Sequence, residues 1–181
     1  MRVLALDISR ARLGWTVDAD GGGPPRSGSR ELAYQGADEG EIGLAFKNFL
    51  LDMIRLKHPE IIAIEAPVLS GVPQNQHGME IKLGLLMLAR VLAKPQGARI
   101  VLGNVTTVRK HFVGSGRPGK DGRESKRIVF DRCQALGWPV KNHDESDSAA
   151  LWCWAKAVHD KSFRLETGAL LHRVDAARRV A

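Results

Sequence analysis

The chain has 181 residues, 44% of them hydrophobic, and a formal net charge of +7 at pH 7, so it is long enough to bury a sizeable core in one domain. It contains no run of about 18 apolar residues and enters an apolar strand directly, so we expect neither a membrane segment nor a signal peptide. Cys133 and Cys153 both fall in predicted helices, which is typical of a reduced, cytoplasmic protein with two packed thiols.

The positive charge is concentrated in one segment. Residues 104–142 carry nine basic and three acidic side chains, whereas residues 1–103 are nearly balanced at 12 and 11. A localised basic segment indicates a polyanionic partner, most simply a nucleic acid. The alternative is a solvated face that binds nothing.

The N-terminal part of the chain reads as strands. An apolar run predicts a buried strand over residues 2–8, and residues 13–17 follow as its hairpin partner. Gly14 in the second strand indicates a close approach of another backbone. The Gly- and Pro-rich stretch over 21–29 predicts a loop, and residues 30–35 are expected to form a third strand.

The middle of the chain alternates helices and strands. Residues 38–58 form a predicted helix, followed by an isoleucine-rich strand over 60–64, a helix over 80–94 and a strand over 99–102. The apolar positions of the first helix fall on one face, which comprises Ile42, Phe46, Phe49, Met53 and Leu56.

The C-terminal part is predicted to be helical over residues 106–113, 124–136 and 144–159. The loop over 114–123 contains four glycines, which predict mobility. Residues 160–181 are basic and weakly helical, and we expect an exposed or partner-bound tail.

This order of elements predicts an α/β fold. Three antiparallel strands would come first, and the strand that ends at Glu65 would join beside the first strand, parallel to it, through a helical crossover. Parallel neighbours end on the same side of a sheet. Asp7 and Glu65 are therefore expected near one sheet edge.

Asp144 and Asp147 are three residues apart, so they share one face of the last helix. The face continues through Leu151, Trp154 and Val158, which are expected to pack on the sheet. In a structural interpretation, Asp144 caps this helix and Asp147 imitates a capping box. Asp7 would then be a strand-end turn residue, and Glu65 would pair with a cation such as Arg90. The functional interpretation requires all four acids to converge.

Four convergent carboxylates would repel one another and raise their own pKa values. An oxygen-only cluster suits hard cations such as Mg²⁺ or Mn²⁺. Two such ions about 3.5–4 Å apart can clamp a phosphodiester, and the basic segment would hold the neighbouring DNA phosphates.

Several motifs of the chain carry a family resemblance. They are LALDISRARLGW around Asp7, IIAIEAP around Glu65, KLG at 82–84, VRKHFVGSG from Val108, and HDESDSAALWCWA around Asp144 and Asp147. In order and spacing, over roughly residues 1–160, they resemble the RuvC-like Holliday-junction resolvases of the RNase H-like superfamily, in some respects the phage-type members.

The resemblance implies a RuvC-like nuclease domain over residues 1–160 with a five-stranded mixed sheet flanked by helices, and a basic tail of the same domain over 161–181. It implies a bacterial or phage-encoded homodimer that acts in DNA recombination and repair. The implied reaction is Mg²⁺- or Mn²⁺-dependent paired nicking of a four-way DNA junction, which leaves 5′-phosphate ends. Two metal ions per active site are implied, and no nucleotide cofactor.

The resemblance also implies roles for particular residues. The catalytic and metal-binding acids would be Asp7, Glu65, Asp144 and Asp147. Arg109 and Lys126 match basic positions that are expected to contact the phosphate of the scissile strand. Further DNA-binding candidates are Lys110, Lys120, Arg123 and Arg127, and auxiliary candidates are His143 and Lys82. A surface histidine beside the helix is the simpler interpretation of His143.

The chain departs from the family pattern in three places. DIS at 7–9 replaces the frequent DPG, and Val68 and Leu69 stand where an aromatic residue commonly wedges near the junction centre. The glycine-rich insertion before Lys126 is longer than in the bacterial enzymes. The sequence preference at the junction is therefore left open.

Three tryptophans could stack on bases, namely Trp138, Trp152 and Trp154. Trp154 reads more readily as core, and Trp152 could face a dimer partner. The candidate dimer faces are the apolar faces of the helices over 80–94 and 124–136.

Other functions compete with the junction nuclease. One alternative is a less selective nuclease of the same fold that cuts branched DNA or RNA–DNA hybrids, and the sequence distinguishes it poorly from a junction nuclease. A non-catalytic nucleic-acid binder would have no reason to keep a repulsive acid cluster. An actin-like ATPase predicts a Gly-rich, phosphate-gripping hairpin after Asp7, but residues 9–14 contain one glycine.

Overall fold

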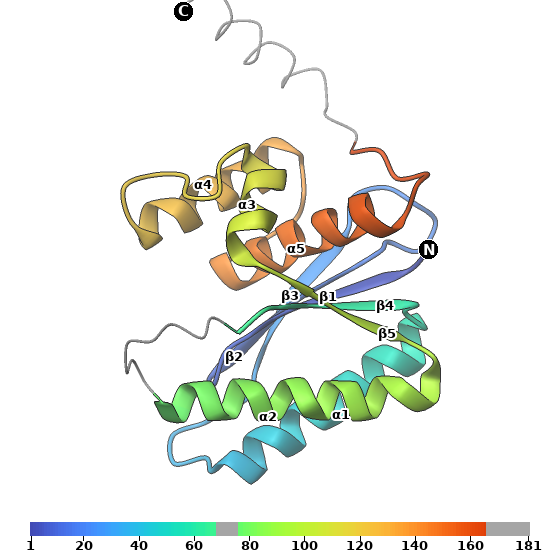
Figure 1. The fold of residues 1–181 in the computed structure, drawn as a ribbon, viewed down its shortest axis with the longest axis vertical. Helices are drawn as coiled ribbons and strands as arrows, with labels where there is room; N and C mark the ends of the chain where they lie inside the picture. Colours follow the sequence, from blue (N-terminus) through green and yellow to red (C-terminus); the bar gives the residue numbers. More distant parts are fainter. Residues whose placement is uncertain (68–75, 166–181) are drawn as a thin grey trace, which may run out of the picture.

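Strands form one mixed sheet in the order β3-β2-β1-β4-β5 (Figure 1). The computed structural model describes residues 1–67 and 76–165. The strands span Val3–Ile8 (β1), Arg12–Val17 (β2), Arg26–Glu31 (β3), Ile61–Glu65 (β4) and Arg99–Gly103 (β5). β1, β2 and β3 are antiparallel neighbours, whereas β4 and β5 extend the sheet parallel to β1. The predicted α/β fold and the predicted pairing of β4 with β1 are confirmed.

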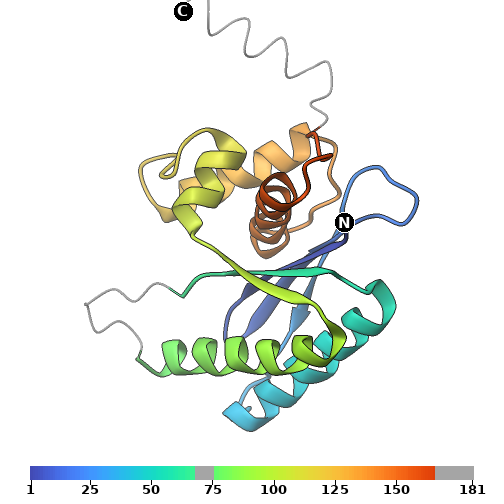
Figure 2. The same cartoon turned by 45° about the vertical axis from the view of Figure 1, so that its right-hand side comes forward.

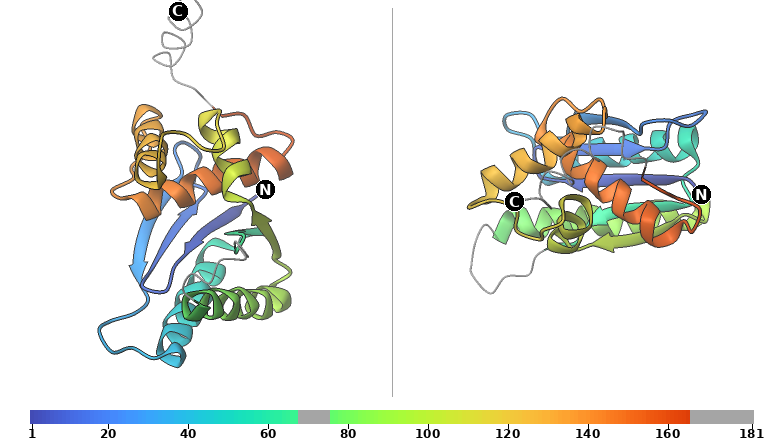
Figure 3. Two further views of the ribbon diagram at one scale, coloured as in Figure 1. Left: turned by 60° about the vertical axis from the view of Figure 1, so that its left-hand side comes forward. Right: turned by 90° about the horizontal axis from the view of Figure 1, so that it is seen from above.

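Helices cover both faces of this sheet. They span Glu39–Lys57 (α1), Gln76–Ala93 (α2), the 3-10 turn Lys94–Gln96 (η1), Val105–Val113 (α3), Gly122–Ala135 (α4) and His143–His159 (α5). α1 and α2 lie on one face, and α3, α4 and α5 lie on the other (Figure 2). α5 lies directly along the sheet (Figure 3) and contacts all five strands. Its first turn is therefore held at the sheet surface.

The alternation of side chains along β1 divides the core into two clusters. Leu4 and Leu6 pack with α1 and α2, whereas Val3 and Ala5 pack with α3, α4 and α5. Side chains two residues apart point to the same face of a strand. Asp7 therefore belongs to the face that α5 covers.

The edge strand β3 corrects one sequence expectation. The third strand spans Arg26–Glu31 rather than 30–35, so it begins inside the stretch 21–29 predicted to be a loop and overlaps the predicted strand only at residues 30 and 31. Six consecutive residues of β3 pair with β2, and this ladder overrides the weak strand propensity of glycine and serine. Gly28 is also required for packing, because a Cβ there would lie 2.5 Å from the ring of Trp15.

The observed helix boundaries agree with those predicted from the sequence to within four residues. α1 begins after a capping box formed by Asp38 and Glu41 and ends at a left-handed His58. Its buried face includes Leu50 and Ile54 rather than Leu56, which is 73% exposed. α2 begins earlier than predicted, at Gln76. Among the described residues, no helix combines the length and apolar character that a membrane span requires.

The glycine-rich segment before α4, for which the sequence predicts mobility, has defined contacts at its C-terminal end. Asp121 caps α4 through the backbone N–H of Glu124 at 2.8 Å. The side chain of Glu124 accepts in turn from the N–H of Lys120 at 2.6 Å, and the hydroxyl of Ser125 donates to the carbonyl of Pro118. The basic side chains of this segment are thus carried on a loop that hydrogen bonds hold to the start of α4.

Candidate active site

Asp7 and Glu65 lie at the carboxyl ends of adjacent parallel strands. Leu6 pairs with Ile64, so the next residue of each strand is one of these acids. Glu65 has the parity of Ile61 and Ala63, which pack on the α5 side. Both carboxylates therefore lie on the same face of the sheet. The sequence predicted that Asp7 and Glu65 share an edge, and the structure adds that they share a face.

The first turn of α5 brings two more acids to this edge. Asp7 pairs with Gly14 in β2, and a Cβ on Gly14 would lie only 2.0 Å from the backbone carbonyl oxygen of Asp144. The predicted close approach at Gly14 is thus confirmed, and the approaching backbone is that of α5. The absence of a side chain at Gly14 lets the helix rest on the sheet beside Asp7.

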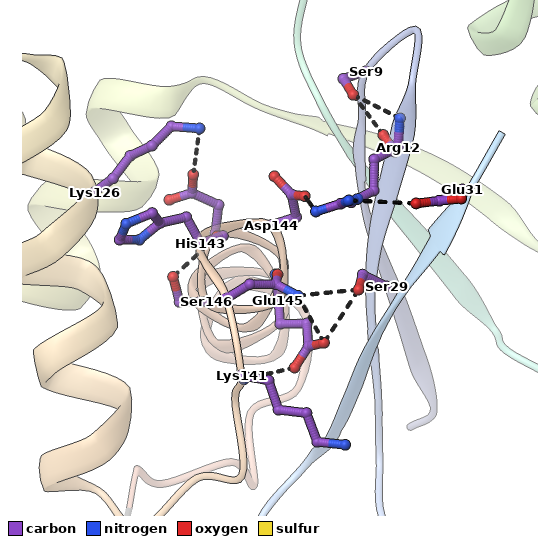
Figure 4. A network of polar contacts seen from close by, with 12 residues as sticks. Ser9, Arg12, Ser29, Glu31, Lys126, Lys141, His143, Asp144, Glu145 and Ser146 are labelled. Atoms are coloured by element: carbon purple, nitrogen blue, oxygen red, sulfur yellow. Dashed lines mark hydrogen bonds and ion pairs between the residues drawn. The ribbon is translucent and has the colours of Figure 1, made fainter. Parts of the chain in front are cut away.

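Neither acid of α5 is the helix cap that the structural interpretation proposed. Asn142 is the N-cap, and its side-chain oxygen accepts from the backbone N–H of Glu145 at 3.0 Å. Asp144 and Asp147 are consequently free of capping, and both are partly buried. Figure 4 shows Asp144 on the side of the helix that faces Arg12.

The pKa values show that the acids interact. Burial first, then the charges of Glu65 and Asp147, and to a smaller extent Asp144, raise the pKa of Asp7 to about 8. Burial and then Asp147 raise the pKa of Glu65, and burial raises the pKa of Asp147 against nearby cations. Burial is thus the main reason why the ionised form of these acids is disfavoured, and repulsion between the carboxylates adds to it for Asp7 and Glu65.

Cationic side chains surround these acids. Lys126 Nζ lies 3.6 Å from Asp147 Oδ2, and the charges of Lys126 and Arg109 lower the pKa of Asp147. The charges of Lys82 and Arg109 likewise lower the pKa of Glu65. Three of the residues that the sequence analysis selected thus belong to the electrostatic surroundings of the acids.

Arg12 is a site residue that the sequence analysis did not select. Its guanidinium lies 3.8 Å from Asp144 Oδ2 and 3.5 Å from Glu31 Oε1 (Figure 4). The alternation of side chains along the second strand could have indicated Arg12. It lies two residues from Gly14 and so points to the same face of the sheet as Asp7.

The remaining residues predicted to belong to the site lie around the four acids, and most of their side chains are exposed. His143 is exposed, packs edge-on against Phe130 and lowers the pKa of Asp147 through its charge. Exposed basic side chains on α3, the following loop and α4 include Lys110, Lys120, Arg123 and Arg127. Val68 and Leu69 lie outside the described residues, as does most of the predicted tail.

The tryptophans are part of the core. Trp138 and Trp152 are 6% and 5% exposed and pack edge-to-face, and Trp152 also packs on Phe163. The suggestions that Trp152 faces a dimer partner and that these two rings stack on bases are therefore wrong. Trp154 is partly buried against the same cluster, as predicted.

The donor chemistry of the four acids fits a hard divalent cation. The potential ligands are carboxylate oxygens only, and burial raises the pKa values of three of them, those of Asp7, Glu65 and Asp147. Within residues 1–67 and 76–165, however, no three His, Cys, Asp or Glu side chains are arranged closely enough to hold a metal ion. The assignment of metal ligands accordingly remains a proposal.

A five-stranded mixed sheet in this order, with helices on both faces and acids at the ends of β1, β4 and the start of α5, defines an RNase H-like α/β fold. Comparison with solved structures places it among the folds of Holliday-junction resolvases. Thermus thermophilus RuvC matches with 19% identity and a TM-score of 0.62, covering 84% of this chain and 91% of that chain.

Two further structures give the same result. T. thermophilus RuvC in complex with a Holliday junction substrate matches with 18% identity and a TM-score of 0.60, covering 84% of this chain and 90% of that one. The yeast mitochondrial Holliday junction resolvase matches with 10% identity and a TM-score of 0.53, over 82% and 75%. No family model and no curated protein matches the sequence. At these identities the comparisons establish a shared fold.

Proposed function

We propose that this protein is a metal-dependent, structure-selective endonuclease that resolves four-way DNA junctions. The observation that carries the proposal is the convergence of Asp7, Glu65, Asp144 and Asp147 on one face of a RuvC-like fold, beside a basic segment. One of the similar structures was determined with a Holliday junction bound, which supports branched DNA as the substrate class.

The acids would hold Mg²⁺ or Mn²⁺, with two ions per site. When bound, such ions supply Lewis-acid activation of water and stabilisation of the leaving oxygen in phosphodiester hydrolysis. Asp7 and Glu65 contribute from the rigid sheet, and Asp144 and Asp147 from α5. Because each carboxylate is at least partly buried, its position is set by the packing of the element that carries it.

The cationic residues would bind the DNA backbone. Lys126 lies beside Asp147, and the charge of Arg109 acts on Glu65 and Asp147, so both would contact the phosphate of the strand to be cut. Lys110, Lys120 and Arg123 are exposed on α3 and on the loop and first turn that lead into α4, where they would contact phosphates of the neighbouring duplex.

A homodimer would supply the second nick. Exposed apolar residues follow one another at intervals of four along α2, namely Leu83, Met87 and Val91, at 43%, 57% and 58% exposure. By contrast, the apolar residues of α4 pack against α5, with Val129 and Cys133 fully buried. We therefore assign the dimer face to α2.

Met87→Lys should convert the dimer to a monomer in sedimentation experiments, and an unchanged dimer would contradict this assignment.

Cleavage of several DNA substrates in parallel tests the function. The wild-type protein should cut a synthetic four-way junction with Mg²⁺ or Mn²⁺, and it should not cut with Ca²⁺ or EDTA. Asp7→Asn should abolish cutting while junction binding persists, and Asp52→Asn, which removes an exposed acid of α1, should cut normally. Cutting by Asp7→Asn at the wild-type rate would refute the proposal. Equal cleavage of junction, flap, RNA–DNA hybrid and linear duplex would instead identify a less selective nuclease.

A further inference from the structure

A third acid at the start of α5, Glu145, is turned away from the site and is only 3% exposed. Its carboxylate accepts hydrogen bonds from the backbone N–H of Lys141 at 2.8 Å, from Asn142 Nδ2 at 3.1 Å and from Ser29 Oγ at 3.3 Å. Asn142 Nδ2 also donates to Ser29 Oγ at 3.1 Å. We call this set of contacts the Ser29–Asn142–Glu145 clamp (Figure 4).

The clamp joins α5 to the edge strand of the sheet. Ser29 in β3 pairs with Gly14, and Gly14 pairs with Asp7. Ser29 and Asp7 therefore lie in one row across three strands. The carbonyl of Asp144 rests on Gly14, between them. This row of Ser29, Gly14 and Asp7 thus contains one acid of the site and contacts the helix that carries Asp144 and Asp147.

Burying the Glu145 carboxylate would be costly without partners. Three donors and the positive end of the α5 macrodipole offset this cost. Lys141 and Asn142 directly precede α5, whereas Ser29 lies on the sheet, so the contact of Glu145 with Ser29 depends on the helix being in its present orientation. Successive residues of an α-helix are rotated by about 100°. A rotation that released Glu145 would turn Asp144 and Asp147 away from Asp7 by the same angle.

We propose that the Ser29–Asn142–Glu145 clamp positions the α5 acids for metal binding, and that Glu145 is a positioning residue rather than a ligand. The inference rests on the proposed function, because it assigns a role in assembling the same site. It explains why three acids occur within four residues at the start of α5, although only two of them face Asp7.

Metal affinity measured without DNA tests the clamp directly. Ser29→Ala and Glu145→Gln should each weaken Mn²⁺ binding by about tenfold, as loss of outer-shell support typically does, when free Mn²⁺ is counted by electron paramagnetic resonance. Ser29→Thr, which retains the hydroxyl, should restore the affinity. In cleavage assays, the Mn²⁺ concentration at half-maximal rate should rise while KM for the junction stays unchanged.

Ser27→Ala is the matched control, because Ser27 lies on the same strand but its hydroxyl contacts Thr16 at 2.9 Å rather than Asn142 or Glu145; Thr16 in turn contacts α5 at Ser148, beyond the acids. Its Mn²⁺ affinity should equal that of the wild type, and circular dichroism should show all variants folded. If Glu145→Gln does not fold, Ser29→Ala decides alone.

Two negative results have different meanings. A wild-type protein that binds no Mn²⁺ would overturn the proposed function and the inference together. A wild-type protein that binds Mn²⁺, with Ser29→Ala binding as tightly as Ser27→Ala, would overturn the inference alone.

Discussion

Replacing Asp7 by asparagine should stabilise the metal-free protein while it removes activity. The pKa of Asp7 is raised from 3.8 to about 8 in the folded protein by burial and by the neighbouring carboxylates. At pH 7 the unfolded chain carries an ionised Asp7, whereas the folded site favours the protonated form. Folding must therefore take up a proton, at a cost of about 4 kcal/mol by linkage.

The sign of the pH dependence follows from the raised pKa. The contribution of Asp7 to stability is fully present below its unfolded pKa of 3.8 and is lost as the pH rises towards about 8. An asparagine at this position does not titrate. The advantage of Asp7→Asn over the wild type should therefore be small at pH 4 and should grow up to pH 8.

Allowing for imperfect hydrogen bonding of the amide, we expect a gain of about 3 kcal/mol at pH 8, or roughly 6–12 °C in Tm for a chain of this size. The measurement is thermal or urea unfolding in EDTA at several pH values. Asp52→Asn, at an exposed position of α1, should stay within about 0.5 kcal/mol of the wild type. An Asp7→Asn variant that is less stable than the wild type at pH 8, or a difference that does not change with pH, would refute the reasoning.

Three other predictions concern the same site. Gly14→Ala should destabilise the protein by about 3 kcal/mol, because the new Cβ would lie 2.0 Å from the carbonyl oxygen of Asp144; Gly43→Ala on α1, with no neighbouring atom within 4 Å, should not destabilise it in the same unfolding assay. Saturating Mn²⁺, at about 100 times its dissociation constant, should stabilise the wild type by about 2.7 kcal/mol, and calorimetry should show no comparable effect on Asp7→Asn. Lys126→Ala should weaken junction binding and reduce the slope of log affinity against log salt by about one, whereas an unchanged slope in fluorescence titrations would remove Lys126 from the DNA interface.

The sequence by itself determined much of the architecture and part of the site. The apolar runs and their order specified the parallel pairing of β1 and β4, because a strand–helix–strand unit has few packing solutions. That pairing brought Asp7 and Glu65 to one edge. The spacing of Asp144 and Asp147 placed both on one helical face, because helical periodicity is a local property.

Only the tertiary structure decided the contacts that join distant segments. The edge strand β3 formed from a Gly- and Ser-rich stretch because β2 offered a ladder and α5 offered polar partners to Ser29, neither of which is visible locally. The same holds for the pairing of Arg12 with Asp144 and for the burial of Glu145. These features depend on which faces of α5 and the sheet meet, and that is fixed by packing over the whole domain rather than by any single segment.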